Sequence, residues 1–502
     1  MHAMRRLRIR NVAKFATSVS ALSLILFSLV LTCSQPASAL PAFARKYGLR
    51  CSACHESWPM LNYFGQKFKD NGYQLMNDRD APIWQNPGYW PVVFRITPFW
   101  HRVSTGKVLV DTYSGGTAVG QAVQRISSSG FDLSGLDFHT GGTLEKNISF
   151  YLLPSSDPTG AFHFEQVFVR FDNIGHSPWF NFKLGRFELD NLLSEKRILT
   201  LTGNGGIYQT YHFIPQGDGN IFGQMGDNQL GIEYLGHSVD DRTRISASLV
   251  SSSDGNVNLS TTANAYTGFF AASQAFDAGR LGVQRIGFYA MAGEASTYYL
   301  TSGGIPILGS GIGNKGFTRE GFVGQFYFGS HVGLTVVTQH GSDNAWFGQG
   351  YGNAEATDGN GGTTCTAAPC PPNNVPGTTL PVGSQAPSWN GVTFEGHYIY
   401  SPQLIFIGRY EVEKMSQQAN GSGYNPAFTG ANGLTGPTPS DFGNISTYTI
   451  GFRYNPFMTS RAGLAWHNEY NWLHQDGTGP SLGLSSANIN TSEILLGLDF
   501  DF

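Results

Sequence analysis

Apolar and polar residues alternate along most of the chain after residue 90, and this pattern constrains the fold more than any other feature. Near the C-terminus, Leu496 and Leu498 fall on one face of an extended segment and Asp499 falls on the other. Successive side chains of a β-strand point to opposite faces, so the pattern indicates strands with one apolar and one polar face. Clusters of Gly, Asn, Asp and Pro separate the alternating segments, as expected for turns and loops.

The alternation predicts about 16 strands, an even number. They fall near residues 92–103, 132–141, 145–153, 162–171, 180–188, 228–235, 243–250, 264–272, 285–296, 321–328, 331–339, 392–400, 404–412, 445–454, 461–470 and 491–502. Most alternate connections are short, and the others are long: 111–131, 189–227, 297–320, 340–391, 413–444 and 471–490. This asymmetry is typical of outer-membrane barrels whose two chain ends are periplasmic. We therefore expect an all-β fold, a transmembrane antiparallel β-barrel over residues 91–502.

Composition agrees with strands that face lipid. Charged residues make up only 13% of the chain, aromatic residues make up another 13%, and there are 64 glycines. Few charges with many glycines and aromatics suit neither a disordered chain nor a helical enzyme. The terminal residue, Phe502, resembles the aromatic assembly signal of bacterial outer-membrane barrels. A soluble β-sandwich would show similar alternation, and it stays open as an alternative.

The first 39 residues have the features of an export signal. Arg5, Arg6 and Lys14 belong to a basic region, an apolar stretch spans residues 21–31, and residues 37–39 (Ala-Ser-Ala) match a signal-peptidase site. Removing residues 1–39 takes away five of the 31 basic side chains and none of the 35 acidic ones, which leaves 26 against 35, a net charge of −9. We expect export to the outer membrane and no binding to nucleic acid, because no basic stripe is available for phosphates.

A haem-attachment motif follows the export signal. Cys51, Cys54 and His55 have the C-x-x-C-H spacing of c-type haem attachment. The two thiols at this spacing reach the two vinyl groups on one porphyrin edge, and the following histidine ligates the iron. We therefore predict one covalent haem c, held by Cys51 and Cys54, with His55 as the proximal ligand. A Cys51–Cys54 redox disulfide and a zinc knuckle are the alternatives, although no further Cys or His lies at zinc-ligand spacing nearby.

The second axial ligand of the iron is less well defined by the sequence. Residues 40–90 form a short segment that we expect to be helical and to plug the barrel lumen. Met60 lies five residues after His55, on what we expect to be the same helix, and is poorly placed for the opposite face of the haem. Met76 follows a turn-like Asn-Gly pair at 71–72 and is our candidate distal ligand. A plain packing role for Met76, and His101 or another barrel residue as the ligand, stay open.

Two cysteines lie in the longest predicted loop. Cys365 and Cys370 are separated by only four residues. In an oxidising compartment, cysteines this close are expected to pair, so we predict a disulfide that stiffens the loop. A metal site there has no supporting histidine nearby.

The residues around the haem motif resemble a known family. Residues 41–50 (PAFARKYGLR) and 59–73 (PMLNYFGQKFKDNGY) flank the motif, and together they resemble the opening of fused monohaem cytochrome–porins of the outer membrane, whose best-known members are iron-oxidising cytochromes. The resemblance covers roughly residues 41–75, and the barrel shares only its architecture with that family. It implies electron transfer from extracellular Fe(II), or from another reduced donor, to a periplasmic cytochrome or similar acceptor.

The charges of residues 40–75 and of the rest of the chain are consistent with a haem-bearing plug inside a barrel. Residues 40–75 carry five basic and two acidic side chains, a net charge of +3, in an otherwise acidic chain. A 16-stranded barrel has a lumen that its own side chains do not fill. Arg409, Arg453 and His467 fall on the inward face and could pair with haem propionates, or could be ordinary lumen charges. The competing functions are a solute porin with a haem-bearing plug and a soluble periplasmic haem protein.

Overall fold

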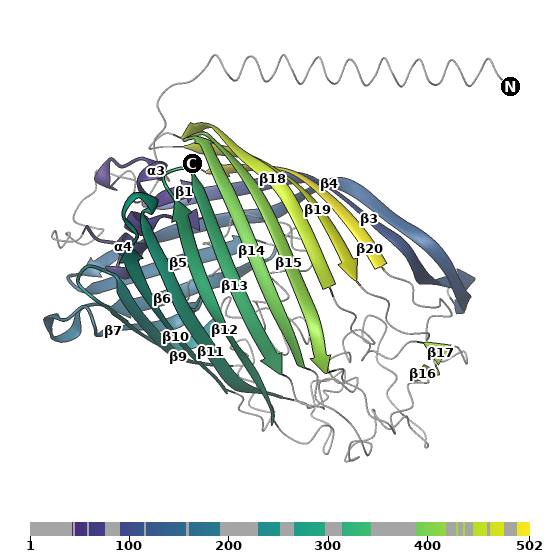
Figure 1. Cartoon of the computed structure of the whole chain (residues 1–502), viewed down its shortest axis with the longest axis horizontal. Coiled ribbons are helices and arrows are strands. Elements are labelled where there is room, and N and C mark those ends of the chain that lie inside the picture. Colours follow the sequence, from purple (N-terminus) through teal and green to yellow (C-terminus); the bar gives the residue numbers. More distant parts are fainter. Residues whose placement is uncertain are drawn as a thin grey trace.

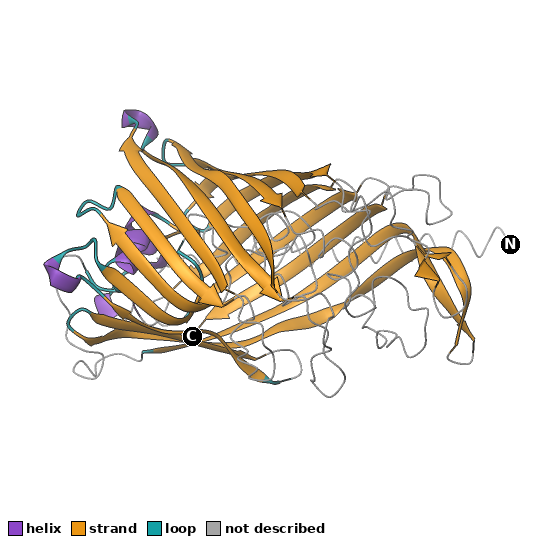
Figure 2. Ribbon diagram, turned by 90° about the horizontal axis from the view of Figure 1, so that it is seen from below, coloured by secondary structure: helices purple, strands orange, loops and turns teal. Residues whose placement is uncertain are grey.

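The structure is a computed structural model, and it describes residues 43, 46–57, 60–75, 91–114, 117–156, 160–190, 229–251, 266–296, 314–342, 388–417, 428–429, 435–436, 445–458, 462–475 and 489–501. Most of these residues belong to a single closed β-barrel (Figures 1 and 2). The helices in this part of the chain are too short or too polar to cross a membrane.

Sixteen strands close the barrel, and each strand is antiparallel to both neighbours. The last strand pairs with the first, so no edge is left open. In chain order the strands are β3 (Val92–Ser114), β4 (Thr117–Glu145), β5 (Ile148–Ser156), β6 (Phe162–Phe171), β7 (Asn181–Phe187), β8 (Gln229–His237), β9 (Thr243–Ser251), β10 (Tyr266–Asp277), β11 (Val283–Ser296), β12 (Asn314–Phe328), β13 (Val332–Ser342), β14 (Ser388–Ser401), β15 (Leu404–Gln417), β18 (Ile445–Met458), β19 (Gly463–Gln475) and β20 (Ile489–Asp501).

The count of sixteen strands is confirmed, and every expected strand overlaps one strand of the barrel. The expected loop over 111–131 is wrong, because these residues extend β3 and β4 into one long hairpin paired as far as Ser114 and Thr117. Backbone pairing overrides the glycine- and serine-rich composition that is typical of a loop. The loop expected over 297–320 ends earlier, since β12 already begins at Asn314.

Seven short connections lie at one end of the barrel, which we call the short-turn end. They join β4 to β5, β6 to β7, β8 to β9, β10 to β11, β12 to β13, β14 to β15 and β18 to β19. Two of them contain single 3₁₀ turns, η1 (Ile174–His176) and η3 (Gly279–Leu281). The first barrel strand begins at this end and the last strand finishes there, with Arg95 opposite Asp501.

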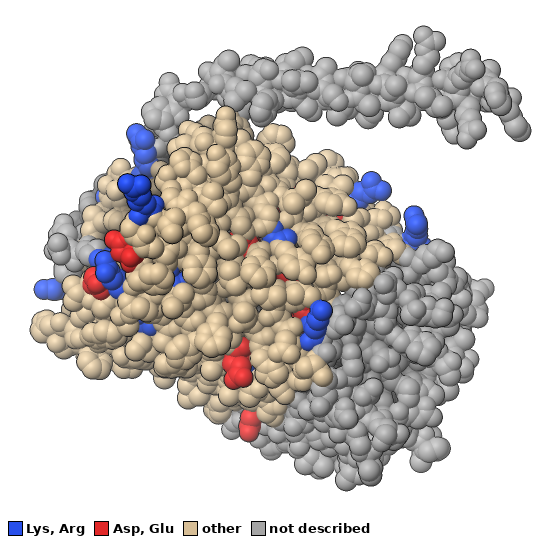
Figure 3. Space-filling view, in the orientation of Figure 1, with Lys and Arg blue, Asp and Glu red and all other residues tan. Residues whose placement is uncertain are grey.

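The wall of the barrel has an apolar outside and a largely polar inside. On β18, Tyr448 and Ile450 are 46% and 65% exposed, whereas Thr449 and Arg453 are almost fully buried. β20 repeats the pattern, with Leu498 exposed and Asp499 buried. On the face that Figure 3 shows, few charged side chains lie on the wall. Because the wall closes on itself, the β-sandwich alternative is wrong.

The N-terminal segment lies at the short-turn end. It contains α3 (Cys51–Cys54), a small hairpin of β1 (His55–Ser57) and β2 (Met60–Leu61), and α4 (Tyr63–Asp70) (Figure 1). A helix running from the motif past Met60 was expected, and this is wrong: α3 ends at Cys54, and His55 pairs with Leu61 instead. A further two-stranded pair, β16 (Phe428–Thr429) with β17 (Thr435–Gly436), lies outside the barrel sheet.

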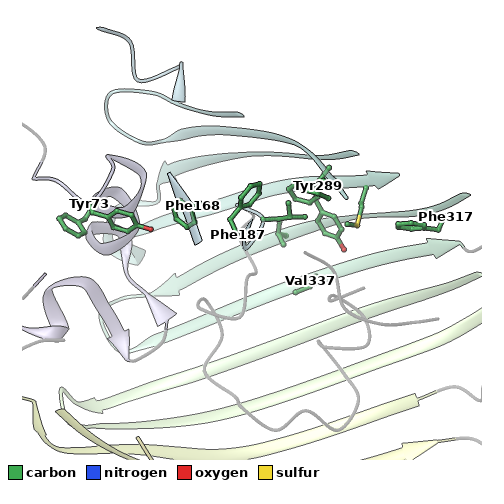
Figure 4. Close-up of a cluster of buried hydrophobic side chains, with 12 residues drawn as sticks. Tyr73, Phe168, Phe187, Tyr289, Phe317 and Val337 are labelled. Atoms are coloured by element: carbon green, nitrogen blue, oxygen red, sulfur yellow. The ribbon is translucent and has the colours of Figure 1, made fainter. Parts of the chain in front are cut away.

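A row of buried apolar side chains connects this segment to the inner wall (Figure 4). Each large apolar side chain that is fully buried contributes about 1.5–3 kcal/mol. The row therefore anchors the segment to one side of the barrel interior. Its members are Phe68 and Tyr73 of the N-terminal segment, Phe168, Phe187, Leu189, Val250, Phe269, Tyr289, Met291, Phe317, Val323 and Val337.

Candidate haem site and its anchor

The haem-attachment motif occupies the turn α3 and the first residue of β1. Cys54 is a free thiol in this structure. Cys54 and His55 are both half-buried. Burial raises the pKa of the Cys54 thiol to about 11, so the thiol is protonated at neutral pH. Among the described residues, no three His, Cys, Asp or Glu side chains are grouped so as to hold a metal ion.

Asn62 joins the motif to α4. It is the N-cap of α4: its side-chain oxygen accepts a hydrogen bond from the backbone N–H of Gly65 at 2.9 Å. Its side-chain nitrogen donates to the carbonyls of Ser52 and Ala53, and its backbone N–H donates to the carbonyl of Cys54. One residue thus satisfies a free donor at the start of one helix and carbonyls at the end of another.

Gly65 allows the two helices to approach each other. A Cβ atom at this position would lie 2.0 Å from the carbonyl oxygen of Cys54 and 2.8 Å from its carbonyl carbon. Because both atoms belong to the backbone, no side-chain rotation could relieve the overlap. Any residue larger than glycine would therefore push α4 away from the motif.

The distribution of buried and exposed side chains around α4 is unusual for a short amphipathic helix. Phe68 is buried and contacts Phe43 and Tyr47 edge to face. Two other aromatic side chains, Tyr63 and Phe64, stay 39% and 38% exposed. The buried face instead includes the polar residues Gln66 and Asp70, and Gln66 donates a hydrogen bond to Asp70 at 2.8 Å. Buried polar groups and exposed aromatics are the informative exceptions to ordinary burial.

The C-terminal end of α4 is held by Arg170 on β6. Its guanidinium donates hydrogen bonds to the backbone carbonyls of Lys69, at 2.9 Å, and of Asp70. The Nε atom of Arg170 also lies 2.5 Å from Oδ1 of Asp172. A cation at the carbonyl end of a helix satisfies its free acceptors and interacts favourably with its dipole. Lys69 adds a contact in which its Nζ lies 3.5 Å from Oδ1 of Asp190.

The side chain of Asp70 forms a second anchor. Its Oδ2 lies 2.9 Å from Nε of Arg244 on β9, and Arg244 also pairs with Asp241 in the turn before β9. Burial alone would raise the pKa of Asp70, but attraction to Arg244 lowers it below its ordinary value. For Asp241 the burial effect prevails over Arg244, and its pKa is raised. Two carboxylates therefore share one guanidinium.

Tyr63 contacts the same turn. Its hydroxyl donates a hydrogen bond to the backbone carbonyl of Asp240. Burial and repulsion from Asp241 raise the pKa of the Tyr63 phenol, which keeps it a hydrogen-bond donor. Both ends of α4 are therefore attached to the short-turn end of the barrel.

Met60 packs on the opposite side of the barrel interior. It is 1% exposed and contacts Ile405 and Ile407 of β15. It therefore serves as an apolar contact of the β1–β2 hairpin with the wall.

The other sequence-predicted residues have protein partners or lie elsewhere. His101 pairs with Glu493 on β20. Arg409 lies 2.9 Å from Glu411, and His467 lies 3.0 Å from Asp499. Arg409, Arg453 and His467 are buried on the inner face of the wall, and whether they pair with haem propionates stays a prediction. The candidate ligand Met76, the cysteines Cys365 and Cys370, and the terminal Phe502 all lie outside the described residues.

Sequence reasoning missed the residues that hold the segment in place. Asn62 and Gly65 could have been found as an N-cap and a glycine inside a predicted helix. Arg170, Asp241 and Arg244 could not, because their partners are far away in the chain and no local pattern marks them.

The closed wall, the apolar exterior and the polar interior define a transmembrane β-barrel. Three solved structures with similar folds are the outer membrane channel DcaP of Acinetobacter baumannii, an anion-selective porin from Comamonas acidovorans, and OprB of Pseudomonas putida. They are 13%, 12% and 11% identical to this chain, with TM-scores of 0.42, 0.43 and 0.42. The alignments cover 82% of this chain and 97%, 99% and 94% of those chains. No protein-family model matches the chain, and no curated protein matches it in sequence.

Proposed function

We propose that this chain carries electrons across the outer membrane through one haem c bound in the N-terminal segment. The observation that carries the proposal is the attachment of the haem motif to the barrel: Asn62 and Gly65 join α3 to α4, and Arg170 and Arg244 join α4 to the inner wall. A redox group held there would sit at the short-turn mouth of a closed transmembrane wall.

The residues of the motif suit the group. Cys51 and Cys54 would hold the haem by thioether bonds, and His55 would be the proximal ligand of its iron. Cys54 and His55 are half-buried and adjacent, and Cys54 is not consumed by a disulfide. When bound, the haem supplies a one-electron couple whose potential depends on its axial ligands and surroundings.

The direction of transfer follows from the location of the parts. The export signal, the closed wall and its apolar outside support an outer-membrane location, with the short-turn end in the periplasm. With the acceptor in the periplasm, the donor under this proposal lies outside the cell. The resemblance of residues 41–75 to iron-oxidising cytochrome–porins favours Fe(II), with a periplasmic cytochrome or similar carrier as the acceptor.

The test uses intact cells that express the wild-type chain or His55→Ala, supplied with Fe(II) or with a membrane-impermeant reductant. Haem reduction by both donors in the wild type, and by neither in the variant, supports the proposal. Reduction by the impermeant reductant alone would retain electron transfer and reject iron. If neither donor reduces a covalently attached haem, the proposal is wrong.

A solute porin with a haem-bearing plug is the second candidate function. The polar inner face favours it, since buried polar residues such as Thr449, Glu469 and Asp499 line the interior. Conductance of the purified protein in planar bilayers separates the two functions. A large, steady ion conductance with an intact haem segment would favour the porin.

A further inference from the structure

The surface beside the haem motif combines exposed aromatic side chains with basic ones. We call it the mouth patch, and it comprises Arg50, Tyr63, Phe64, Lys67, Val239 and Arg242. It lies at the short-turn end, where Figure 3 shows Lys and Arg side chains together with a few acidic ones.

One hydrogen bond joins the two parts of the patch, α4 and the β8–β9 turn. Tyr63 on α4 donates a hydrogen bond to Asp240, which lies between Val239 and Arg242 in the β8–β9 turn. Lys67 lies one helical turn after Tyr63 and Phe64, on the same side of α4. Arg50 directly precedes α3, which packs against α4 at Gly65.

Its apolar centre is exposed to an unusual degree. Val239 is 78% exposed, and Tyr63 and Phe64 are each nearly two-fifths exposed, although α4 buries Gln66 and Asp70. Tyrosine, phenylalanine and arginine are the residues enriched at protein–protein contacts, with polar residues around them.

Its charge is mainly positive. Arg242 lies 3.5 Å from Asp240, and these two exposed charges offset each other. Arg50, which is exposed, and Lys67, which is partly exposed, remain as excess positive charge in the patch. Complementary charges accelerate the encounter of weakly bound electron-transfer partners and orient them.

We infer that the mouth patch docks a soluble periplasmic one-electron carrier whose docking face is acidic. The inference rests on the proposed function, and it adds where on this protein the acceptor docks and which charge its docking face carries. A haem held by Cys51 and Cys54 would supply the single electron that the carrier accepts, and Arg50 and Lys67 would attract and orient the acidic face of the carrier. No bond forms or breaks, and no proton is transferred.

The experiment measures oxidation of the dithionite-reduced, purified protein by two small probes, anionic ferricyanide and cationic tris(phenanthroline)cobalt(III). At low ionic strength, Arg50→Glu/Lys67→Glu should slow oxidation by ferricyanide by about tenfold and accelerate oxidation by the cobalt complex, and salt should remove both effects. Lys146→Glu/Arg280→Glu is the matched control, because it changes the net charge equally on two other exposed turns of the same end.

Equal rates in the two double variants would overturn the inference while leaving the proposed function intact. A protein that contains no covalent haem would overturn both.

The aromatic centre of the patch is tested with an acidic blue-copper protein as the oxidant. Phe64→Ser should slow oxidation by the copper protein several-fold and leave the rate of oxidation by ferricyanide unchanged. An unchanged rate with the copper protein would contradict a docking role for Phe64.

Discussion

The Nε atom of Arg244 on β9 lies 2.9 Å from Oδ2 of Asp70, the last residue of α4. This pair links the segment that carries the haem motif to the wall of the barrel. Asp70 is buried, the side chain of Arg244 is 14% exposed, and Arg244 also pairs with Asp241. Removal of the pair should therefore loosen the segment without unfolding the barrel.

Arg244→Ala should destabilise the docked segment by about 2–3 kcal/mol. Breaking a buried pair costs ~3–5 kcal/mol because a charge is left uncompensated, and the partial exposure of Arg244 reduces this value. The measurement is the rate at which a protease cleaves within residues 43–75 in the purified protein, since proteolysis of a locally opened state follows its population. Arg242→Ala is the control, because this neighbour is about half exposed and pairs only with exposed Asp240. Equal cleavage rates in the two variants would show that the pair does not hold the segment.

Docking of the segment should weaken in strong acid through Asp70. Attraction to Arg244 holds the pKa of this carboxylate below its ordinary value of 3.8 despite burial. A carboxylate whose pKa is lowered by folding stabilises the folded state at pH values above its pKa in the unfolded chain. This stabilisation is lost as the pH falls through its pKa in the folded protein. Protease resistance should therefore persist down to about pH 4 and decline below it, whereas Asp70→Asn should remove that decline. The raised pKa of Asp241 acts in the opposite direction, because burial and repulsion from Asp70 favour its protonated form in the folded state. A wild-type decline that begins near neutral pH would contradict this assignment.

Asn62→Ala should lower the yield of covalent haem. The substitution removes the N-cap of α4, worth about 1 kcal/mol, together with the hydrogen bonds that hold the carbonyls of Ser52 and Ala53. Haem content per protein is measured by absorbance after denaturation. Asn62→Asp keeps the capping oxygen and loses the donor, so its yield should be intermediate. If Asn71→Ala, which affects only the other end of α4, reduces the yield equally, the special role of Asn62 is refuted.

Gly65→Ala should separate the haem motif from α4. The added methyl group would lie 2.0 Å from the Cys54 carbonyl oxygen, and backbone atoms cannot give way locally. Haem staining after denaturing electrophoresis should fall several-fold. Gly408→Ala is the matched control, because a Cβ atom there meets nothing within 4 Å. Full staining of the Gly65 variant would mean that the two helices do not need this close approach.

Met76→Ala should remove the methionine–iron absorption band and lower the haem potential, since methionine ligation raises it. This tests the candidate distal ligand, which lies outside the described residues. An unchanged spectrum would transfer the role to His101 or to another barrel residue.

The barrel could be predicted from the sequence because its signal is local. Leu498 and Asp499 show their opposite faces in the sequence itself, and the same rule holds on strand after strand. The long β3–β4 hairpin could not be predicted from the sequence, because residues such as Ser127–Ser129 show no apolar–polar alternation. Only their pairing with β3 makes them extended. The anchor could not be predicted either. Nothing near Asp70 or Arg244 indicates that the two residues meet, since their contact depends on how the whole barrel closes.

The contacts that hold the N-terminal segment also determine when it can dock during biogenesis. Its partner Arg170 lies 100 residues after Asp70, and Asp240 lies 177 residues after Tyr63. Arg170 and Asp240 come together on one surface only when β6 to β9 have paired, and contacts between residues so distant in sequence form late. The N-terminal segment is therefore among the last parts of the described chain to be fixed. Under the proposed function, that interval is when the Cys51–His55 motif would be free of the barrel wall and open to haem attachment.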